Sequence, residues 1–476
     1  MSNYKDLKSQ SECTTIIVGK NAMADNSRIV ARSEDMDAKM AKNFEFFHDT
    51  ENGSEEFVAM DSTFRCKLPK KAFGYTTVAP YCLQGHWGNV GYNTQGVGMS
   101  ATETIFSSAK ALSFDPYVES GLAENSVYNV VLPYITTAKE GVLRLGKMIE
   151  EYGSAEGFGI GFIDQNETWY LENACGHRWL ACQIPDDVYF ATGNQSRFRE
   201  YNSNDKKNFL ASGDLIDFAK KNNLYDVSKE FDFHTAYSRD EKLDTTYNYP
   251  RVWDLQRIFS PEIKNDVTKN TFPVFAKPKK LITVTDLRNV FRTHYDKTEH
   301  DPYYNNNPKE SYRPISIMRC VQTHILQVRE NLPKEIGEVN YMELGMAALS
   351  VFIPYYQGIS RFLPCFSKGT NKSSKDSAYW TFRKVQTLGM VNYNKYAPMI
   401  KERYRNYEAE MDQRMKEMET EYLRIYKEQP LRAKDMIQEF EDMAMQKALD
   451  ISEELIEELL THLTLDIEKE YYFHGA

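Results

Sequence analysis

The sequence predicts an α+β protein, and three observations lead to this fold class. The first half of the chain is dominated by short runs with the β-branched and aromatic content typical of strands. A second block of strands is expected at Ile315–Val328 and Met346–Ile353. From Tyr396 to Leu465 the chain is rich in Glu, Lys, Met and Leu with helical periodicity. Strand blocks followed by a helical block are typical of the α+β class.

Composition indicates a large globular protein. The 476 residues exceed what one simple core holds, so one large domain with appendages or two domains are expected. The chain has 58 basic and 68 acidic residues, a net charge of -10 and a pI near 5.6. An acidic chain without a basic cluster gives no support to nucleic-acid binding.

The N-terminal stretch MSNYKDLKSQSE lacks the apolar core of a secretory signal peptide, and no later stretch is apolar for long enough to cross a bilayer. The cytoplasm is therefore the expected compartment, with no membrane partner. Seven scattered cysteines lack the paired spacings of a zinc site, so most are expected to be reduced, buried thiols and no metal site is predicted.

The first regular element is predicted to be a hairpin that begins at Cys13. The preceding segment, Met1–Glu12, is polar and without periodicity, and is expected to be disordered. The sequence predicts two strands, Thr14–Val18 and Ile29–Ala31, with the turn-forming residues Asp25–Ser27 between them.

The hairpin is expected to gather three reactive groups. If its strands pair about a centre near Met23, Arg32 lies opposite Thr14, and the side chains of Arg32 and Asp35 return to the neighbourhood of Cys13. A thiol, a guanidinium and a carboxylate then meet at one end of a sheet.

The remaining elements follow from the same patterns. A turn at Thr192, Gly193 and Asn194 ends one strand, and a helix is expected from Glu103 onward. Further strands are expected at Val97–Thr102, Gly157–Ile163, Thr168–Glu172, His177–Gln183 and Val188–Ala191. Helices are expected at Tyr249–Ile258, with Arg251 near its start, at Asp286–His294, and as two long antiparallel helices after Tyr396 that are broken at Pro430. The charge of the last two is most simply a solvated face.

A cysteine at this position is more often a buried structural thiol than a nucleophile. Three features favour the nucleophile: Cys13 begins a strand, it follows a polar lead segment, and Arg32 and Asp35 return to it. If the lead segment were removed, the α-amine of Cys13, with an ordinary pKa of about 7.7–8.0, would lie beside its own sulfur and could act as the base. Arg32 would favour the thiolate, and Asp35 would hold the amine and the thiol in position.

Several strings carry a resemblance to a known family. They are CTTIIVGK, IVARSED, NTQGVGMSATET, WYLENACGHRW and YPRVWDLQR. They resemble the peptidase family C69 dipeptidases of the N-terminal nucleophile (Ntn) hydrolase superfamily, in particular the dipeptidase A enzymes of lactic acid bacteria. The likeness extends from Cys13 to about Arg383 and is weakest over the C-terminal helices.

The resemblance implies a four-layer αββα Ntn-hydrolase sandwich with a long helical C-terminal extension. It implies a removable propeptide at 1–12, a catalytic domain at 13–395, and helices at 396–476 that pack on the core or serve in assembly, so a homo-oligomer is expected. It also implies autocatalytic exposure of Cys13 and hydrolysis of dipeptides of broad specificity, without a cofactor or metal.

The resemblance also assigns site residues, by matching the motifs of the family to positions in this sequence. Cys13 matches the nucleophile, and Arg32 and Asp35 match the pair that flanks it in the bile-salt and penicillin amide hydrolases. Asn194 resembles the asparagine that helps to form the oxyanion hole, and Arg251 resembles the later active-site arginine. The amide hydrolases have an asparagine where this chain reads GVGMSAT, so a backbone N–H near Thr102 is the candidate for the second oxyanion donor.

Each assignment has a structural alternative. Arg32 could pair with Glu34 or Asp35, Asn194 could be only a left-handed turn residue, and Arg251 could cap a helix. Further titratable residues were weighed: His177 and His324 as partners of a cysteine, for which a structural role is favoured, and Glu103 and Glu172 as ligands of a dipeptide's ammonium group, for which a surface or structural role is favoured.

Two rival functions stay open. The same set of residues would serve an amidase that acts on non-peptide N-acyl amides. A non-catalytic relative could instead use the helices from Tyr396 to Leu465 as a protein-binding arm.

Overall fold

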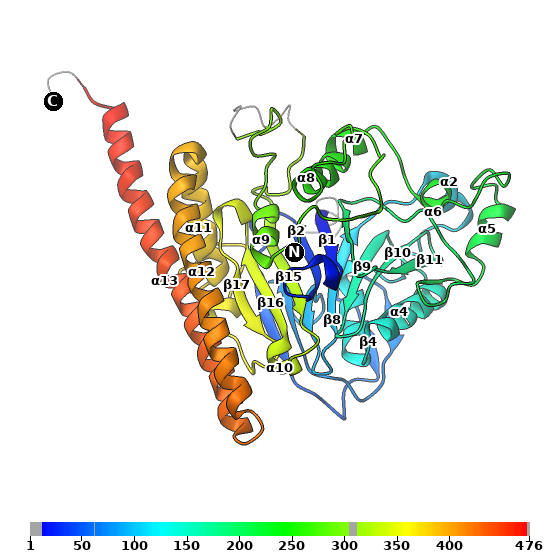
Figure 1. The fold of residues 1–476 in the computed structure, drawn as a ribbon, viewed down its shortest axis with the longest axis horizontal. Helices are drawn as coiled ribbons and strands as arrows, with labels where there is room; N and C mark the ends of the chain where they lie inside the picture. Colours follow the sequence, from blue (N-terminus) through cyan, green and yellow to red (C-terminus); the bar gives the residue numbers. More distant parts are fainter. Residues whose placement is uncertain (1–11, 61, 304–311, 474–476) are drawn as a thin grey trace.

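The computed structural model describes residues 12–60, 62–303 and 312–473, and its centre is a pair of antiparallel sheets (Figure 1). The predicted disordered segment lies, up to residue 11, outside the described residues. The first sheet has, in spatial order, β14 (Phe275–Ala276), β12 (Tyr189–Thr192), β1 (Glu12–Val18), β2 (Arg28–Asp35), β15 (Cys320–Val328), β16 (Glu338–Leu344) and β17 (Ile353–Tyr356). The second has β13 (Phe209–Ala211), β11 (Trp179–Gln183), β10 (Thr168–Asn173), β9 (Phe158–Ile163), β8 (Gly98–Thr104) and β7 (Val90–Tyr92).

The two sheets pack face to face. β1 and β2 contact β8, and β2 also contacts β9 and β10. Gly161 of β9 leaves room for β2, because a Cβ atom there would lie 2.7 Å from Val30 Cγ1. Both faces of β2 are covered, and all its residues are buried, so the charged side chains of its RIVARSED sequence are enclosed between layers.

Helices cover the outer faces of both sheets (Figure 1). The second sheet is covered by α3 (Glu124–Val131) and α4 (Ala138–Tyr152), and the first by α11 (Ala378–Val391), α12 (Tyr393–Ile425) and α13 (Pro430–Glu470). The expected four-layer αββα arrangement is therefore confirmed. Two small ribbons pair β3 (Lys42–Phe47) with β6 (Tyr75–Pro80) and β4 (Glu56–Val58) with β5 (Arg65–Lys67).

The remaining helices are short and lie in the connections. They are α2 (Ala109–Phe114), α5 (Leu215–Lys221), α6 (Phe233–Tyr237), α7 (Asp244–Tyr247), α8 (Tyr249–Phe259), α9 (Val284–Phe291) and α10 (Lys334–Gly337), with 3₁₀ turns η1 (Lys20–Ala22), η2 (Leu132–Tyr134), η3 (Ala347–Leu349) and η4 (Pro364–Ser367). In the part of the chain that the structure describes, no helix is apolar over a length that would span a lipid bilayer.

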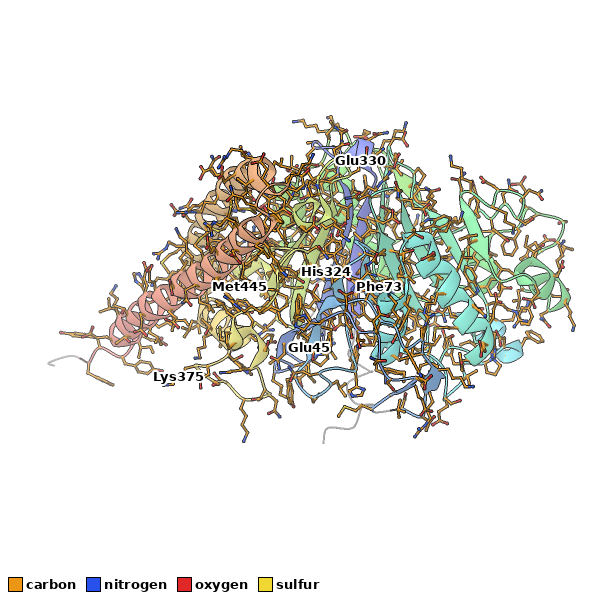
Figure 2. All side chains as sticks on the ribbon, turned by 90° about the horizontal axis from the view of Figure 1, so that it is seen from below. Glu45, Phe73, His324, Glu330, Lys375 and Met445 are labelled. Carbon is orange, nitrogen blue, oxygen red and sulfur yellow. The ribbon has the colours of Figure 1, made fainter. Side chains whose placement is uncertain are left out.

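The long C-terminal helices are a layer of the core. The break predicted at Pro430 is confirmed, because α13 begins at that residue, in the first helical turn where proline is tolerated. The inner face of α13 is buried and includes Met445, labelled within the helical layer in Figure 2. Glu441 of α13 is buried and accepts a hydrogen bond from Tyr356 N of β17 at 2.8 Å. The boundary predicted at residue 396 falls inside α12, which begins at Tyr393.

The hairpin of β1 and β2 is confirmed, but its predicted register was wrong by one residue. Arg32 lies opposite Thr15, not Thr14, and Cys13 lies opposite Glu34. The reversal contains the turn η1, so the pairing is centred between Met23 and Ala24. A shift of one residue exchanges the two faces of a strand. The observed register is the one that puts Arg32 on the face of Cys13.

Two other predictions were wrong. Glu103 does not begin a helix: it lies in β8, which continues to Thr104, and the next helix starts only after Ser108, whose side chain caps it. Met346–Ile353 is not a strand, because most of it forms η3 and loop. The strand of this region is β16, with the sequence EVNYMEL. Both of its glutamates are buried, and a sequence with two glutamates does not predict a buried strand.

Candidate active site

Cys13 lies at the start of β1, fully buried between the two sheets. Its Sγ accepts a hydrogen bond from Arg32 Nη1 at 3.0 Å and donates one to the carbonyl oxygen of Thr102 at 3.2 Å. Arg32 Nη1 also donates to this carbonyl oxygen at 2.6 Å. The thiol therefore lies in direct contact with a buried guanidinium, as the sequence predicted.

Arg32 is held in place from the second sheet. Its Nη2 donates to the carbonyl oxygen of Ala101 at 2.8 Å, and its Nε donates to Ser100 Oγ at 3.3 Å. His324, inside the molecule in Figure 2, lies on the neighbouring strand with Nε2 2.9 Å from Ser100 Oγ and Nδ1 3.1 Å from Gln322 Oε1. Burial lowers the pKa of His324 well below its usual value, so this ring is neutral and supports Ser100.

The electrostatic surroundings of Cys13 are mixed. Burial raises the pKa of its thiol well above the usual value, and the charge of Arg32 opposes this shift. The carboxyl groups of Glu103, Glu124 and Glu34 raise the pKa of the thiol further. In this state of the chain Cys13 is a neutral thiol, and Arg32 is the cation in direct contact with it.

Asp35 does not lie where the sequence predicted. It pairs with Glu12 in the hairpin, so its side chain points to the face opposite Cys13 Sγ, and its carboxylate forms a close ion pair with Arg313. The shifted register is the physical reason. Asp35 still lies next to the peptide bond that joins Glu12 to Cys13, on the strand paired with it.

Asn194 is brought to the main chain of Cys13. It lies two residues after the end of β12, in the left-handed conformation with φ of 59°. Its Oδ1 accepts hydrogen bonds from Cys13 N at 3.3 Å and from Arg251 Nη2 at 2.7 Å, while its Nδ2 donates to the carbonyl oxygen of Thr104 at 2.9 Å. The amide oxygen therefore faces Cys13 while the bond before Cys13 is intact.

Arg251 joins the turn of Asn194 to the first strand. It is fully buried, and its Nη1 donates to the carbonyl oxygen of Cys13 and, at 2.9 Å, to Thr14 Oγ1. Its Nη2 donates to the carbonyl oxygen of Gly193 at 3.0 Å. Residue 193 must be small, since a Cβ atom there would lie 2.9 Å from Arg251 Cζ. Arg251 thus fixes the main chain of the candidate nucleophile, and its Nε also donates to the carbonyl oxygen of Tyr247, the last residue of α7, at 2.9 Å.

Thr102 presents its carbonyl oxygen, not its N–H, to Cys13. This oxygen accepts from both Arg32 and the thiol. The second oxyanion donor near Thr102 stays a prediction.

Glu103 is a part of this site that was judged a surface or structural residue from the sequence. Its Oε2 accepts a hydrogen bond from Thr15 Oγ1 at 2.6 Å, and its Oε1 accepts one from Asn194 N at 2.8 Å. It therefore joins β1 to the turn that carries Asn194. The packing of β8 on β1, which brings Glu103 to these partners, had no signal in the sequence.

Other buried charges around the hairpin come from distant segments. Glu34 pairs with Lys42 at 2.8 Å and accepts from Gln322 Nε2 at 2.9 Å, and both members of the pair are fully buried. Burial raises the pKa of Glu124 to about 8.

Two residues weighed for chemistry have structural contacts. Glu172 accepts hydrogen bonds from Ser196 Oγ at 2.5 Å and Arg197 N at 2.8 Å, which braces the chain after Asn194. His177 Nδ1 lies 2.8 Å from Asp115 Oδ1.

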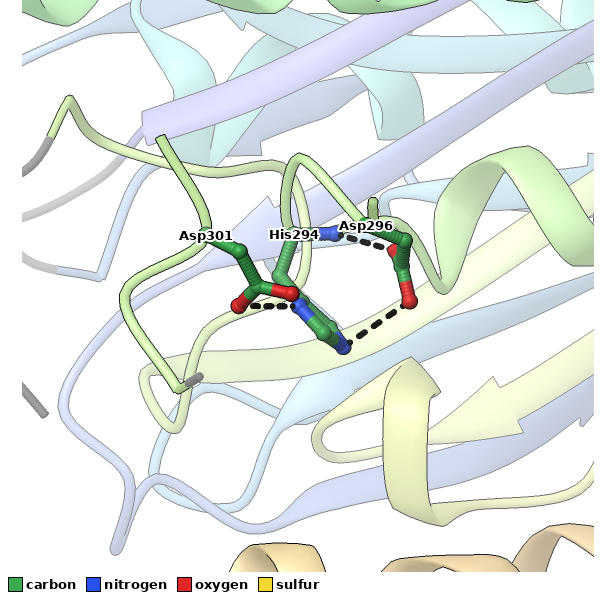
Figure 3. Close-up of side chains that lie close together, drawn as sticks. All are labelled: His294, Asp296 and Asp301. Atoms are coloured by element: carbon green, nitrogen blue, oxygen red, sulfur yellow. Dashed lines mark hydrogen bonds and ion pairs between the residues drawn. The ribbon is translucent and has the colours of Figure 1, made fainter. Parts of the chain in front are cut away.

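One cluster among the described residues has the side chains of a metal site. It consists of His294, Asp296 and Asp301 (Figure 3). His294 Nδ1 lies 2.9 Å from Asp301 Oδ1, and His294 Nε2 lies 3.2 Å from Asp296 Oδ1 and 2.6 Å from the Tyr393 hydroxyl. Both ring nitrogens thus have protein partners, and the contact with Tyr393 ties the loop after α9 to the start of α12.

The burial of Glu103 predicts how the stability of the protein depends on pH. Burial raises the pKa of Glu103 to about 7, above the unfolded value of about 4.3, so its ionisation costs the folded state stability as the pH rises through 7. Relative to wild type, Glu103→Gln is expected to gain about 2–3 kcal/mol of unfolding free energy between about pH 5 and about pH 8. Urea unfolding at both pH values measures this. The exposed Glu428→Gln is the control, and an equal difference at both pH values would contradict the prediction.

Comparisons with known proteins show the family of this chain. The sequence profile of Peptidase family C69 matches residues 12–406. The chain belongs to Peptidase family C69. This C69 chain is 47% identical over 361 residues to "Probable dipeptidase" of Salmonella dublin, covering 75% of this chain and 83% of the relative. It is 30% identical over 400 residues to "Dipeptidase A" of Lactobacillus helveticus, covering 82% and 84%.

A solved structure is also similar. The penicillin V acylase of Agrobacterium tumefaciens matches with a TM-score of 0.32 and 11% identity, over 72% of this C69 chain and 86% of the acylase.

Proposed function

We propose that this C69 chain is a cysteine N-terminal nucleophile dipeptidase of broad specificity, with Cys13 as the nucleophile. The observation that carries the proposal is the buried contact of Cys13 Sγ with Arg32 at 3.0 Å, at the first residue after the lead segment. The dipeptidase names of the relatives support the substrate class.

Activation would require cleavage of the bond between Glu12 and Cys13. While this bond is intact, the nitrogen of Cys13 is an amide whose N–H donates to Asn194 Oδ1, and an amide cannot serve as a base. In the proposed step Sγ attacks the carbonyl carbon of Glu12 and the acyl group moves from nitrogen to sulfur. Water then hydrolyses the thioester. The products are a carboxylate at Glu12 and a free α-amine at Cys13, so the unprocessed chain is a zymogen.

Turnover would use the new α-amine. The amine takes the proton of Sγ, and the thiolate attacks the peptide carbonyl carbon of the dipeptide. Asn194 Nδ2 and a backbone N–H near Thr102 would bind the oxyanion. The amine then gives its proton to the leaving nitrogen as the C–N bond breaks. Water, deprotonated by the amine, hydrolyses the thioester and restores the thiol.

The remaining charged residues would have supporting roles. Arg32 would stabilise the thiolate, because its Nη1 already contacts Sγ. Asp35 would orient the new amine, for which its place beside the Glu12–Cys13 bond is suitable once that bond is cut. Arg251 would keep the main chain of Cys13 and the turn of Asn194 together.

The rival enzyme is an amidase acting on non-peptide N-acyl amides. Paired assays with Ala-type and Leu-type dipeptides and with N-acyl amides separate the two. Hydrolysis of the dipeptides is expected. Activity on the N-acyl amides alone would overturn the proposed substrate class.

The rival non-catalytic role uses α12 and α13 as a binding arm. Both helices contribute buried side chains to the main core, and α13 contacts β17, so deleting them is expected to abolish folding. A folded deletion variant with unchanged turnover that has lost a binding partner would support the arm. The cytoplasmic location and the self-assembly stay predictions.

A further inference from the structure

Charged groups lie on both faces of the hairpin around Cys13. The Cys13 thiol is in contact with Arg32 and is acted on by the carboxyl groups of Glu34, Glu103 and Glu124. On the opposite face lies Glu12, whose Oε2 is 3.6 Å from Arg319 Nη1. Glu12 also interacts electrostatically with the buried Arg313. Two arginines thus lie near the residue that precedes Cys13, and one of them, Arg313, is already paired with Asp35.

The leaving residue of a dipeptide must come close to the nitrogen of Cys13. In the proposed mechanism the α-amine gives its proton to the leaving nitrogen, so the two nitrogens come within hydrogen-bond distance, about 3 Å. The α-carboxylate of the leaving residue is only two bonds from that nitrogen. Glu12 is bonded to Cys13 N, so its removal frees the space beside this nitrogen, which the leaving nitrogen must approach.

The side chain of Glu12 shows what this space accepts. Its Oε2 is enclosed by protein and has no hydrogen-bond partner among the described residues, and its ion pair is with Arg319. Cleavage of the Glu12–Cys13 bond removes this carboxylate from Arg319. A guanidinium binds a carboxylate through two parallel hydrogen bonds, a geometry closer than the 3.6 Å contact with Glu12.

We propose that Arg319, with Arg313 behind it, forms a subsite for the free C-terminal carboxylate of the dipeptide, and that Glu12 occupies this subsite until the chain is processed. The inference rests on the proposed function and deepens it: it explains a restriction to dipeptides, because a longer peptide carries an amide at this position. On this side of the hairpin Arg313 is already paired with Asp35, so Arg319 is the group that would bind the carboxylate directly.

The test compares a Leu-type dipeptide with the same dipeptide amidated at its C-terminus. The proteins are wild type, Arg319→Met and Arg319→Lys, each shown by intact mass to begin at Cys13. The exposed Arg361→Met is the matched control. Arg319→Met is expected to raise the KM for the dipeptide about 10-fold to 100-fold, with kcat changed by less than about threefold and with unchanged kinetics on the amide. Arg319→Lys is expected to retain most of the affinity, because it keeps the charge.

The outcomes are distinguishable. Equal losses on the dipeptide and its amide, or a wild-type enzyme that prefers the amide, would overturn the subsite and leave the dipeptidase function standing. A processed wild-type protein that hydrolyses neither substrate would overturn both proposals. If Arg319→Met is not processed, Arg319→Gln carries the comparison: a loss confined to the dipeptide supports the subsite, and equal losses or no loss overturn it.

Discussion

Cys13→Ala is expected to abolish dipeptide hydrolysis, with turnover reduced by at least about 10⁴-fold, and to leave residues 1–12 attached. The physical reason is that one sulfur atom serves both reactions. It attacks the carbonyl carbon of Glu12 during activation and the peptide carbonyl carbon during turnover, and alanine has no nucleophile at this position. Steady-state kinetics and intact mass, measured on the same preparation, check the two effects together.

Cys365→Ala is the matched control for loss of a thiol. Cys365 lies in η4, away from the hairpin, and is only partly buried. This variant is expected to be processed and active as wild type. A Cys13→Ala protein with turnover near that of wild type would remove Cys13 from the mechanism.

Arg32→Met is expected to reduce turnover at neutral pH by about 10-fold to 10³-fold, since an adjacent opposite charge shifts a pKa by about 1–3 units. Arg32 is the cation that opposes the effect of burial on the pKa of the Cys13 thiol. Removing it raises that pKa further and lowers the fraction of thiolate. The activity lost at neutral pH is therefore expected to recover in part as the pH rises, and a pH profile of kcat/KM measures this recovery.

Arg28→Met is the control on the same strand. Arg28 is also buried and ion-paired, with Asp186, but it lies at the other end of β2. It is expected to lose stability without the change in the pH profile. A parallel loss of activity in both variants, with one pH profile, would show that Arg32 acts through folding alone.

The local part of the fold could be predicted from the sequence. The hairpin follows from two β-branched runs and a turn string, and Pro430 marks the start of α13. The register could not be predicted to the residue, because it depends on how η1 shapes the reversal. A register shift of one residue decides whether Arg32 or its chain neighbours lie on the same face of the sheet as Cys13.

The contacts between distant segments could not be predicted. Asp35 was placed beside the thiol, but it pairs with Arg313, 278 residues further along the chain (313 − 35), and no local pattern shows this ion pair. Glu103 reaches Asn194 only because β8 packs on β1. β16 was missed because Glu338 and Glu343 are fully buried, which a strand pattern does not anticipate.

Asn194 and Arg251 were found through a resemblance, and the structure shows why motif alone is incomplete. Both converge on the main chain of Cys13, through Cys13 N and the Cys13 carbonyl oxygen. The geometry adds that Asn194 presents its oxygen while the Glu12–Cys13 bond is intact. An oxyanion role therefore requires Asn194 Nδ2 to turn from Thr104 toward the substrate.

The most direct test of the central claim is the intact mass of the purified, catalytically active protein. The account predicts a chain that begins at Cys13, lighter by residues 1–12, and activity that rises in step with the fraction cleaved. A fully active chain that retains residues 1–12 would contradict it, because the α-nitrogen of Cys13 would then be an amide and could not act as the base.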